Sequence, residues 1–189
     1  MKNTEYILYL DMDGVLVDFN GGYRKLSNGK TIEETNDEEG ERAARAKYLA
    51  AGEEFWANLD WIQGGQELWN AAKNLFEHVA ILSSAGTTDA ERGKMVDAGK
   101  RRWLQKNMPD MDQSNVFIVL GKHNKQKYSS KLGILVDDVR VTIDQWNKAG
   151  GFGILHNSKH FKKTIEDLED ISRPISLAEI VKRFRHWYL

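Results

Sequence analysis

The sequence predicts an α/β protein built on a Rossmann-like, doubly wound parallel sheet that carries a small helical insertion. Two observations favour this class. Five short apolar runs are spaced along the chain and alternate with segments of helical character. Three of these runs end in acidic or hydroxyl residues, which is typical of the carboxyl ends of parallel strands, where ligands bind.

The first strand is expected at residues 6–10, YILYL, and the turn after it contains Gly14. A continuous apolar run of this length predicts a strand that is buried on both faces. Asp11 and Asp13 follow it with one residue between them, which puts both side chains on the same side of an extended backbone. An Asx-type turn is the alternative interpretation, because Asp and Gly are common turn formers.

Residues 20–58 are expected to form a small helical cap, and 1–19 with 59–189 the core domain. The cap segment shows no strand signal and contains an acidic run at 33–41 and a helix-favouring run at 41–51.

The rest of the chain alternates strands with helices. Thr88 and Glu91 fit a capping box at the start of one helix, and Ser176 and Glu179 fit a second in the tail. The tail is expected to pack on the core as an amphipathic segment, with a nucleic-acid patch as the alternative. Further strands are expected at 79–82, 116–120, 134–136 and 152–155, and helices at 66–76, 88–108 and 142–149.

Composition limits the classes of function. The 189 residues are 41% hydrophobic, enough for one sizeable core, and their net charge of −1 gives no reason to expect nucleic-acid or membrane-surface binding. Cys is absent, which excludes disulfides, thiolate nucleophiles and Cys-bound zinc. No apolar run suits a signal peptide or a membrane span, so a soluble cytoplasmic protein is expected.

Polar groups at the strand ends predict phosphate chemistry. Parallel strands end at one edge of a sheet, so four carboxylates there would raise each other's pKa unless a cation neutralised them. Mg2+ accepts carboxylates together with phosphate oxygens, and hydroxyls and a lysine of the 122–131 loop can hold the phosphate. The residues concerned are Asp11, Asp13, Ser83, Ser84, Asp137 and Asp138.

One of the carboxylates is then free to act as a nucleophile. Mg2+ and cationic donors stabilise the phosphoryl group in transfer, so an Asp can form an aspartyl-phosphate. A second acid two residues along the chain can protonate the leaving oxygen and later activate water.

The motifs resemble those of the haloacid dehalogenase (HAD) superfamily. DMDGVLVDF after an apolar strand resembles the first motif, and ILS at 81–83 resembles the second. Lys127 and the pair Asp137-Asp138 resemble the third and fourth, in the right order.

A closer resemblance is to the 5'(3')-deoxyribonucleotidases, over roughly residues 5–156. DMDGVLVDFNGGYRKL and EFWANLDWIQGGQEL are similar to segments of that family, and KQKYSSKLGILVDD has its spacing of eleven residues from Lys127 to Asp138. Lys100 and Trp103 fall where the family has a Lys and a Trp.

This resemblance implies Asp11 as the nucleophile and Asp13 as the acid and base. It implies that Mg2+ is held by Asp11, the backbone carbonyl of Asp13 and Asp138. Asp137 would support these ligands without binding the metal directly.

The resemblance also implies a phosphate site and an aromatic wall for a base. Ser83, Ser84 and Lys127 would bind the phosphate, with Lys100 as a further candidate and Lys125 and Lys131 as alternatives to Lys127. Base stacking suits a flat aromatic face. The wall would consist of Phe19, Phe55 and Trp56, although ordinary packing is the alternative for the last two.

The expected function is that of an Mg2+-dependent phosphatase acting on nucleoside 5'- or 3'-monophosphates, preferably deoxyribonucleotides. Two departures from the family bear on the substrate. Ser83-Ser84-Ala85 replaces Thr-Ser-Pro, which keeps the hydroxyl, and the insertion is shorter than in the mammalian enzymes, which leaves base and sugar preference open. The alternatives are a sugar phosphate or a 3'-phosphate nucleic-acid end as substrate, or a non-catalytic binding protein. A homodimer also stays open.

Overall fold

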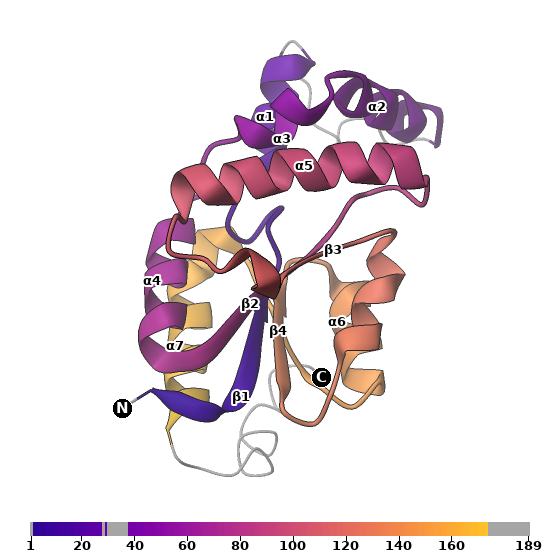
Figure 1. Cartoon of the computed structure of the whole chain (residues 1–189). Coiled ribbons are helices and arrows are strands. Elements are labelled where there is room, and N and C mark those ends of the chain that lie inside the picture. Colours follow the sequence, from indigo (N-terminus) through magenta and orange to yellow (C-terminus); the bar gives the residue numbers. More distant parts are fainter. Residues whose placement is uncertain (1, 28, 30–37, 174–189) are drawn as a thin grey trace.

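A five-stranded parallel sheet in the order β3-β2-β1-β4-β5 forms the centre of the computed structural model (Figure 1). The structure describes residues 2–27, 29 and 38–173, so the predicted tail segment with its capping box lies outside the described residues. The predicted parallel α/β sheet is confirmed. Its strands are β1 (Asn3–Leu10), β2 (Phe76–Ser84), β3 (Val116–Val119), β4 (Gly133–Asp137) and β5 (Phe152–Leu155).

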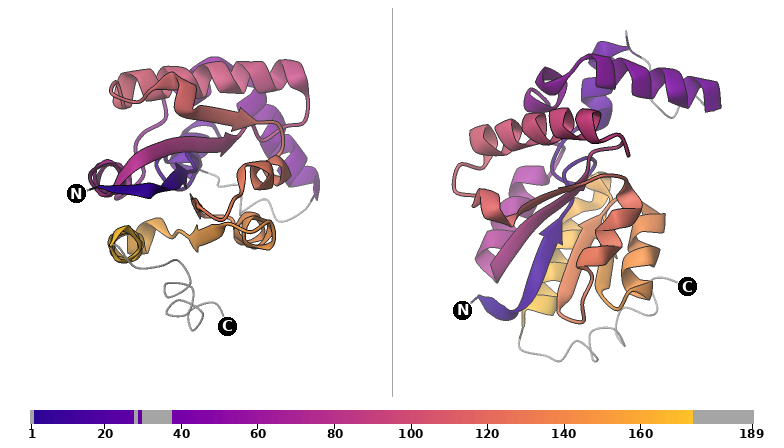
Figure 2. Two further views of the ribbon diagram at one scale, coloured as in Figure 1. Left: turned by 60° about the horizontal axis from the view of Figure 1, so that its bottom comes forward. Right: turned by 45° about the vertical axis from the view of Figure 1, so that its right-hand side comes forward.

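Helices cover both faces of the sheet (Figure 2). Each face has its own apolar cluster. Side chains alternate along a buried strand, so Leu8 and Leu10 of β1 enter the larger cluster while Tyr9 enters the smaller one. The larger cluster includes residues of α4 (Gly65–Leu75), α5 (Ala90–Asn107) and α7 (Phe161–Ser172), and the smaller one residues of α6 (Arg140–Lys148) and the 3-10 helix η2 (Lys122–Tyr128).

Three helices lie between β1 and α4 in the chain and gather beyond α5, above the carboxyl end of the sheet (Figure 1). They are α1 (Phe19–Leu26), α2 (Glu38–Ala50) and α3 (Glu53–Ala57). The two connections to the sheet are paired with each other, because Asp18 N–H donates to the Asp60 carbonyl at 2.9 Å and Ile62 N–H to the Leu16 carbonyl at 3.0 Å. That these helices form a domain of their own stays a prediction.

The start of α5 corrects the predicted capping box by one residue. Asp89, not Thr88, is the N-cap, and its carboxylate accepts from Arg92 N–H at 2.9 Å. The hydroxyl of Thr87 accepts from Asp89 N–H at 3.1 Å. Asp is as good a cap as Thr, so the sequence pattern located the helix but not its first residue.

Two further 3-10 helices, η1 (Gln113–Asn115) and η3 (Ser158–His160), complete the described elements. No helix in residues 2–27 and 38–173 combines the length and the apolar character that a membrane span needs.

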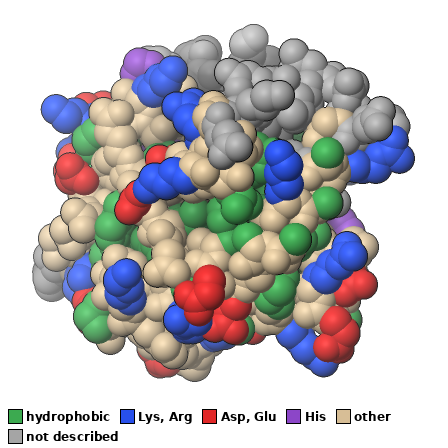
Figure 3. Space-filling view, turned by 90° about the horizontal axis from the view of Figure 1, so that it is seen from above, with side chains coloured by type: hydrophobic (Ala, Val, Ile, Leu, Met, Phe, Trp, Pro, Cys, Tyr) green, Lys and Arg blue, Asp and Glu red, His purple; other side chains and the backbone are tan. Residues whose placement is uncertain are grey.

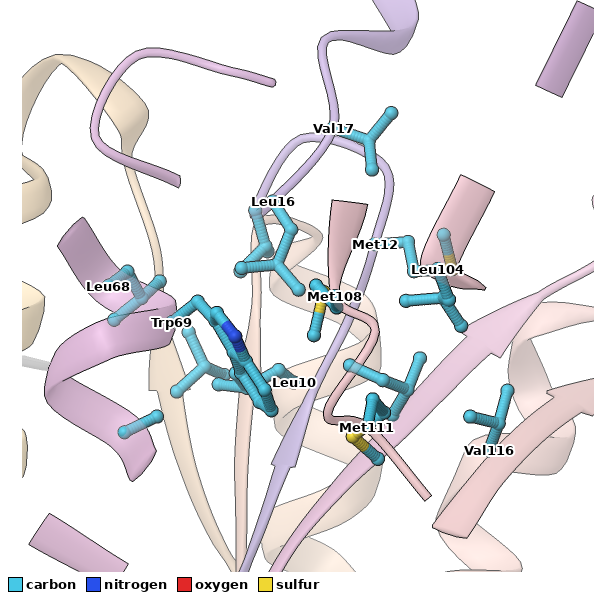
Figure 4. Packing of buried hydrophobic residues seen from close by; sticks show 14 of the residues in the cluster. Leu10, Met12, Leu16, Val17, Leu68, Trp69, Leu104, Met108, Met111 and Val116 are labelled. Carbon is cyan, nitrogen blue, oxygen red and sulfur yellow. The ribbon is translucent and has the colours of Figure 1, made fainter. Parts of the chain in front are cut away.

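Packing around Met12 holds the loop after β1, which carries Asp11 and Asp13. The Met12 side chain is fully buried, and Figure 4 shows it among the apolar residues of the larger cluster, with Leu104 and Met108 of the α5 region. Its carbonyl accepts from the amides of Leu16 and Val17, both at 2.8 Å. The loop after β1 is therefore fixed before any ligand binds.

Candidate active site

Three carboxylates meet at the carboxyl end of the sheet. Leu10 of β1 pairs with Val136 of β4, so the residues that follow these two strands lie side by side. One ligand oxygen each of Asp11, Asp137 and Asp138 lies within 4.8 Å of the others. The sequence expectation that the strand ends bring acids together is thus matched by the geometry.

Lys125 bridges two of these acids. Its ammonium lies 2.8 Å from Oδ2 of Asp11 and 2.6 Å from Oδ2 of Asp137, and all three side chains are buried. The remaining oxygens accept backbone amides, Oδ1 of Asp11 from Met12 at 2.8 Å and Oδ1 of Asp137 from Val139 at 2.9 Å. Both carboxylates are therefore fixed in orientation.

Electrostatics in this cluster keep Lys125 charged. Burial alone would lower the pKa of Lys125, but the charges of Asp11 and Asp137 outweigh it and raise the pKa. The pKa of Asp137 is also raised, first by burial and then by the charge of Asp11, with Lys125 opposing both.

The lysine of this loop that reaches the acids is Lys125, which corrects the preference for Lys127. Lys127 is exposed on η2, and Lys131 is exposed beyond it. A 3-10 helix has three residues per turn, so Lys125 shares a side with Tyr128, which packs on the ring of Phe117 at 4.9 Å between centroids. Lys127 consequently points away from the site.

A second buried lysine holds Asp13. Lys100 of α5 donates to Oδ2 of Asp13 at 2.7 Å, to the hydroxyl of Ser83 at 2.8 Å and to the carbonyl of Ser84 at 2.9 Å. The hydroxyl of Ser84 itself accepts from Gly86 N–H at 3.1 Å. Lys100 therefore links the loop after β1 to β2. It contacts Asp13, the predicted acid and base, whereas Lys127 is exposed on η2.

The two oxygens of Asp13 differ. Oδ2 accepts from Lys100, whereas Oδ1 is buried without a hydrogen-bond partner among the described groups. Burial raises the pKa of Asp13, and the nearby ammonium of Lys100 only partly opposes this shift. A protonated Asp13 would therefore carry its proton on Oδ1.

Asp138 packs against the backbone of Gly14. A Cβ on Gly14 would lie 2.1 Å from Oδ2 of Asp138, and the φ of Gly14 is +79°, so only glycine suits this position. Asp138 stays open to solvent. Desolvation of its carboxylate by the surrounding chain and, after it, the charges of Asp11 and Asp137 raise the pKa of Asp138 to about 7.

This donor set fits a hard divalent cation. Carboxylate oxygens are the ligands that Mg2+ prefers, and three of them converge here. None of the ion pairs among the described residues includes Asp138, so no lysine in direct contact offsets the desolvation and the charges of Asp11 and Asp137 that raise its pKa.

Aromatic rings gather beside the loops that leave the site. Phe19 lies 5.6 Å from Phe55 and 5.2 Å from Tyr48 between ring centroids, and both Phe rings are only partly buried. Trp56 is buried at 3% exposure, so the packing alternative describes Trp56. A Cβ on Gly86 would lie 3.8 Å from the Tyr48 hydroxyl, which places that hydroxyl beside the loop after β2.

Sequence reasoning missed Tyr48, although a signal was present. It is the one aromatic residue in the helix-favouring run at 41–51.

The face formed by the helices above the sheet shows hydrophobic side chains gathered among charged ones (Figure 3).

Comparison with known proteins supports the fold. No family model matches the sequence, and no curated protein matches it. Among solved structures, a HAD hydrolase (family IA, variant 3) of Entamoeba histolytica is similar over 89% of this chain and 99% of its own, with 15% identity and a TM-score of 0.50.

Two further structures are similar at lower scores. A hydrolase of Pseudomonas syringae shares 13% identity over 92% of this chain and 100% of its own, with a TM-score of 0.47. The HAD domain of the effector protein Lem4 of Legionella pneumophila shares 15% over 90% and 98%, with a TM-score of 0.40. The sheet order and the Entamoeba structure together show that the chain has a HAD-like fold.

Proposed function

We propose that the protein is an Mg2+-dependent phosphomonoester hydrolase that works through an aspartyl-phosphate on Asp11. The observation that carries the proposal is the different surroundings of Asp11 and Asp13. Both oxygens of Asp11 accept hydrogen bonds, from Met12 and Lys125, which suits an ionised nucleophile. Asp13 has a raised pKa and one free oxygen, which suits a proton carrier.

The reaction then proceeds in two displacements. An oxygen of Asp11 attacks phosphorus while the ester P–O bond breaks, and the proton on Oδ1 of Asp13 passes to the leaving oxygen. In the second step Asp13 takes a proton from water, the water oxygen attacks phosphorus, and the P–O bond to Asp11 breaks to release inorganic phosphate.

The remaining polar groups would bind the phosphate and the metal. Lys100, Lys125 and the hydroxyl of Ser83 provide donors beside the two acids. Asp11 and Asp138, with the backbone carbonyl of Asp13, would hold Mg2+, which supplies positive charge that stabilises the phosphoryl group in transfer.

We further propose nucleoside monophosphates, preferably deoxyribonucleotides, as the substrates. The resemblance of the opening segment to the deoxyribonucleotidases supports this choice, and so does the partly exposed pair Phe19 and Phe55, on which a base can stack.

A substrate panel tests the proposal. Phosphate release would be measured for dTMP, dUMP, their ribonucleotide counterparts, a sugar phosphate and a 3'-phosphorylated oligonucleotide, each with and without Mg2+. We expect Mg2+-dependent turnover that is fastest on the deoxyribonucleotides. Asp11→Asn should remove turnover, and Asp110→Asn, an exposed acid paired with Lys73, is the matched control. Full activity in Asp11→Asn would exclude the aspartyl-phosphate mechanism.

A further inference from the structure

Helix α3 comes close to the backbone of α5 at a glycine. A Cβ built on Gly99 would lie 2.4 Å from the backbone carbonyl oxygen of Glu53 and 2.9 Å from Cβ of Trp56. Both distances are shorter than real side chains allow, and a backbone oxygen cannot turn away as a flexible side chain can. The absence of a side chain at Gly99 therefore sets how closely the two helices approach.

Other contacts hold α3 in this position. Arg102 of α5 donates to Oε1 of Glu53 at 2.8 Å and to Oε1 of Glu54 at 2.5 Å on the exposed side. On the buried side, the indole N–H of Trp103 donates to the Leu59 carbonyl at 2.7 Å, just beyond α3. The contact at Gly99 is thus bordered by polar contacts on both sides.

Helix α5 also carries the phosphate end of the site. Lys100 directly follows Gly99, and its ammonium contacts Asp13, Ser83 and Ser84. One turn of α5 therefore joins the proposed phosphate-binding end to the helix that carries Phe55.

A side chain at Gly99 would move α3 rather than α5. Val96, Trp103 and Leu104 anchor α5 with no exposed surface, and Arg101 donates to the Val116 carbonyl of β3 at 2.9 Å. Helix α3 is only five residues long, and only its Trp56 and Ala57 are buried. Because α3 is held by fewer buried side chains than α5, α3 would be displaced.

We propose that Gly99 is a positioning residue that fixes the distance between the phosphate-binding end and the aromatic wall at Phe55, and thereby selects phosphomonoesters that carry a base. The inference rests on the proposed function. It predicts that displacement of α3 weakens recognition of the base while the chemistry at Asp11 and Asp13 continues.

The chain offers a matched pair of substitutions. Gly99→Ala and Gly93→Ala make the same change in the same helix, with the same gain in helix propensity. At Gly93 the new Cβ would clash with Cδ2 of Leu120, the end of a flexible and partly exposed side chain, at 2.2 Å, and its other near neighbours are side-chain atoms at 3.6 Å or more. The difference between the two variants therefore isolates the α3 contact.

Steady-state kinetics on dTMP and on 2-deoxyribose 5-phosphate, which keeps the sugar and the phosphate but lacks the base, test the inference. A stacked base contributes enough that its loss should raise KM for dTMP about tenfold in Gly99→Ala. We expect kcat on dTMP and both constants on 2-deoxyribose 5-phosphate to stay within about twofold, because the chemistry at Asp11 and Asp13 continues. Partial unfolding would instead lower both activities together. Gly93→Ala should match the unsubstituted protein on both substrates.

Two results would overturn the inference in distinguishable ways. If the unsubstituted protein has a lower KM for dTMP than for 2-deoxyribose 5-phosphate and Gly99→Ala keeps that preference, Gly99 does not position the wall. If the unsubstituted protein shows no preference, the proposed nucleotidase function fails, and the inference fails with it. Should Gly99→Ala not fold, Arg102→Glu repels Glu53 and Glu54 from the exposed side and should raise KM for dTMP alone, whereas an unchanged KM would reject the inference.

Discussion

Replacement of Lys125 by Met tests the central ion-pair cluster. The substitution keeps most of the buried stem but removes the ammonium between Asp11 and Asp137, at 2.8 and 2.6 Å. Removing one partner of a buried pair costs about 3–5 kcal/mol. Because each carboxylate keeps a backbone amide donor, from Met12 and Val139, we expect the lower end, about 3 kcal/mol.

Urea unfolding followed by circular dichroism measures this loss at pH 7.5, and a thermal melt should show a decrease in Tm of about 6–12 °C for a chain of this size. Lys127→Met is the control. It removes an exposed lysine two residues away, so its effect should stay within about 0.5 kcal/mol. Equal losses in the two variants, or a larger loss in Lys127→Met, would refute the assignment of Lys125 to the cluster.

Three further predictions follow from single groups. The affinity for Mg2+, measured by calorimetry, should fall about tenfold per pH unit below the pKa of Asp138, because protons compete for that carboxylate. Asp138→Asn should remove this pH dependence of the affinity. That pKa is raised to about 7. Burial lowers the pKa of His156 to about 4, so the unfolded chain takes up its proton first as pH falls. The free energy of unfolding, measured with urea, should therefore fall as pH decreases from about 6.5 to about 4, by up to about 3 kcal/mol. The fall should be smaller in His156→Gln. Trp103→Phe removes the donor to the Leu59 carbonyl, which should cost about 1–3 kcal/mol in a thermal melt, and an unchanged melt would show that this bond adds nothing.

The strands could be predicted because each is a short apolar run buried on both faces. Residues 6–10 and 134–136 need no knowledge of their neighbours to be recognised as strands, and they became β1 and β4. Polar residues directly after such runs must lie at the carboxyl edge of a parallel sheet. That Asp11, Asp137 and Asp138 share one edge follows from those two facts, whereas their meeting also depends on β1 lying beside β4, which the structure shows.

The lysine could not be assigned by spacing, because spacing counts residues along the chain and not the direction of a side chain. On η2 the three-residue turn decides which lysine faces inward. Tyr128 fixes that choice, since its ring packs against Phe117 and Tyr9, at 4.9 and 6.4 Å between centroids. The sequence signal was therefore the aromatic residue three positions after Lys125.

The α3–α5 contact lies further beyond sequence reasoning. Gly99 occurs inside a predicted helix, where glycine usually only costs stability, and nothing in the pattern shows that a second helix approaches it. The same holds for Trp56, whose burial depends on that approach. Contacts between segments that are distant in the chain need the fold before they can be inferred.

The charges of the site explain why a divalent cation suits it. Four carboxylates, of Asp11, Asp13, Asp137 and Asp138, face the ammonium groups of Lys100 and Lys125, so the ionised cluster has two negative charges in excess. Desolvation and, after it, this excess of negative charge raise the pKa of Asp138 to about 7. A divalent cation held by these carboxylates would balance the excess. The proposed metal and the lysines would thus have separate tasks, since the lysines orient individual oxygens and the metal would balance the charge.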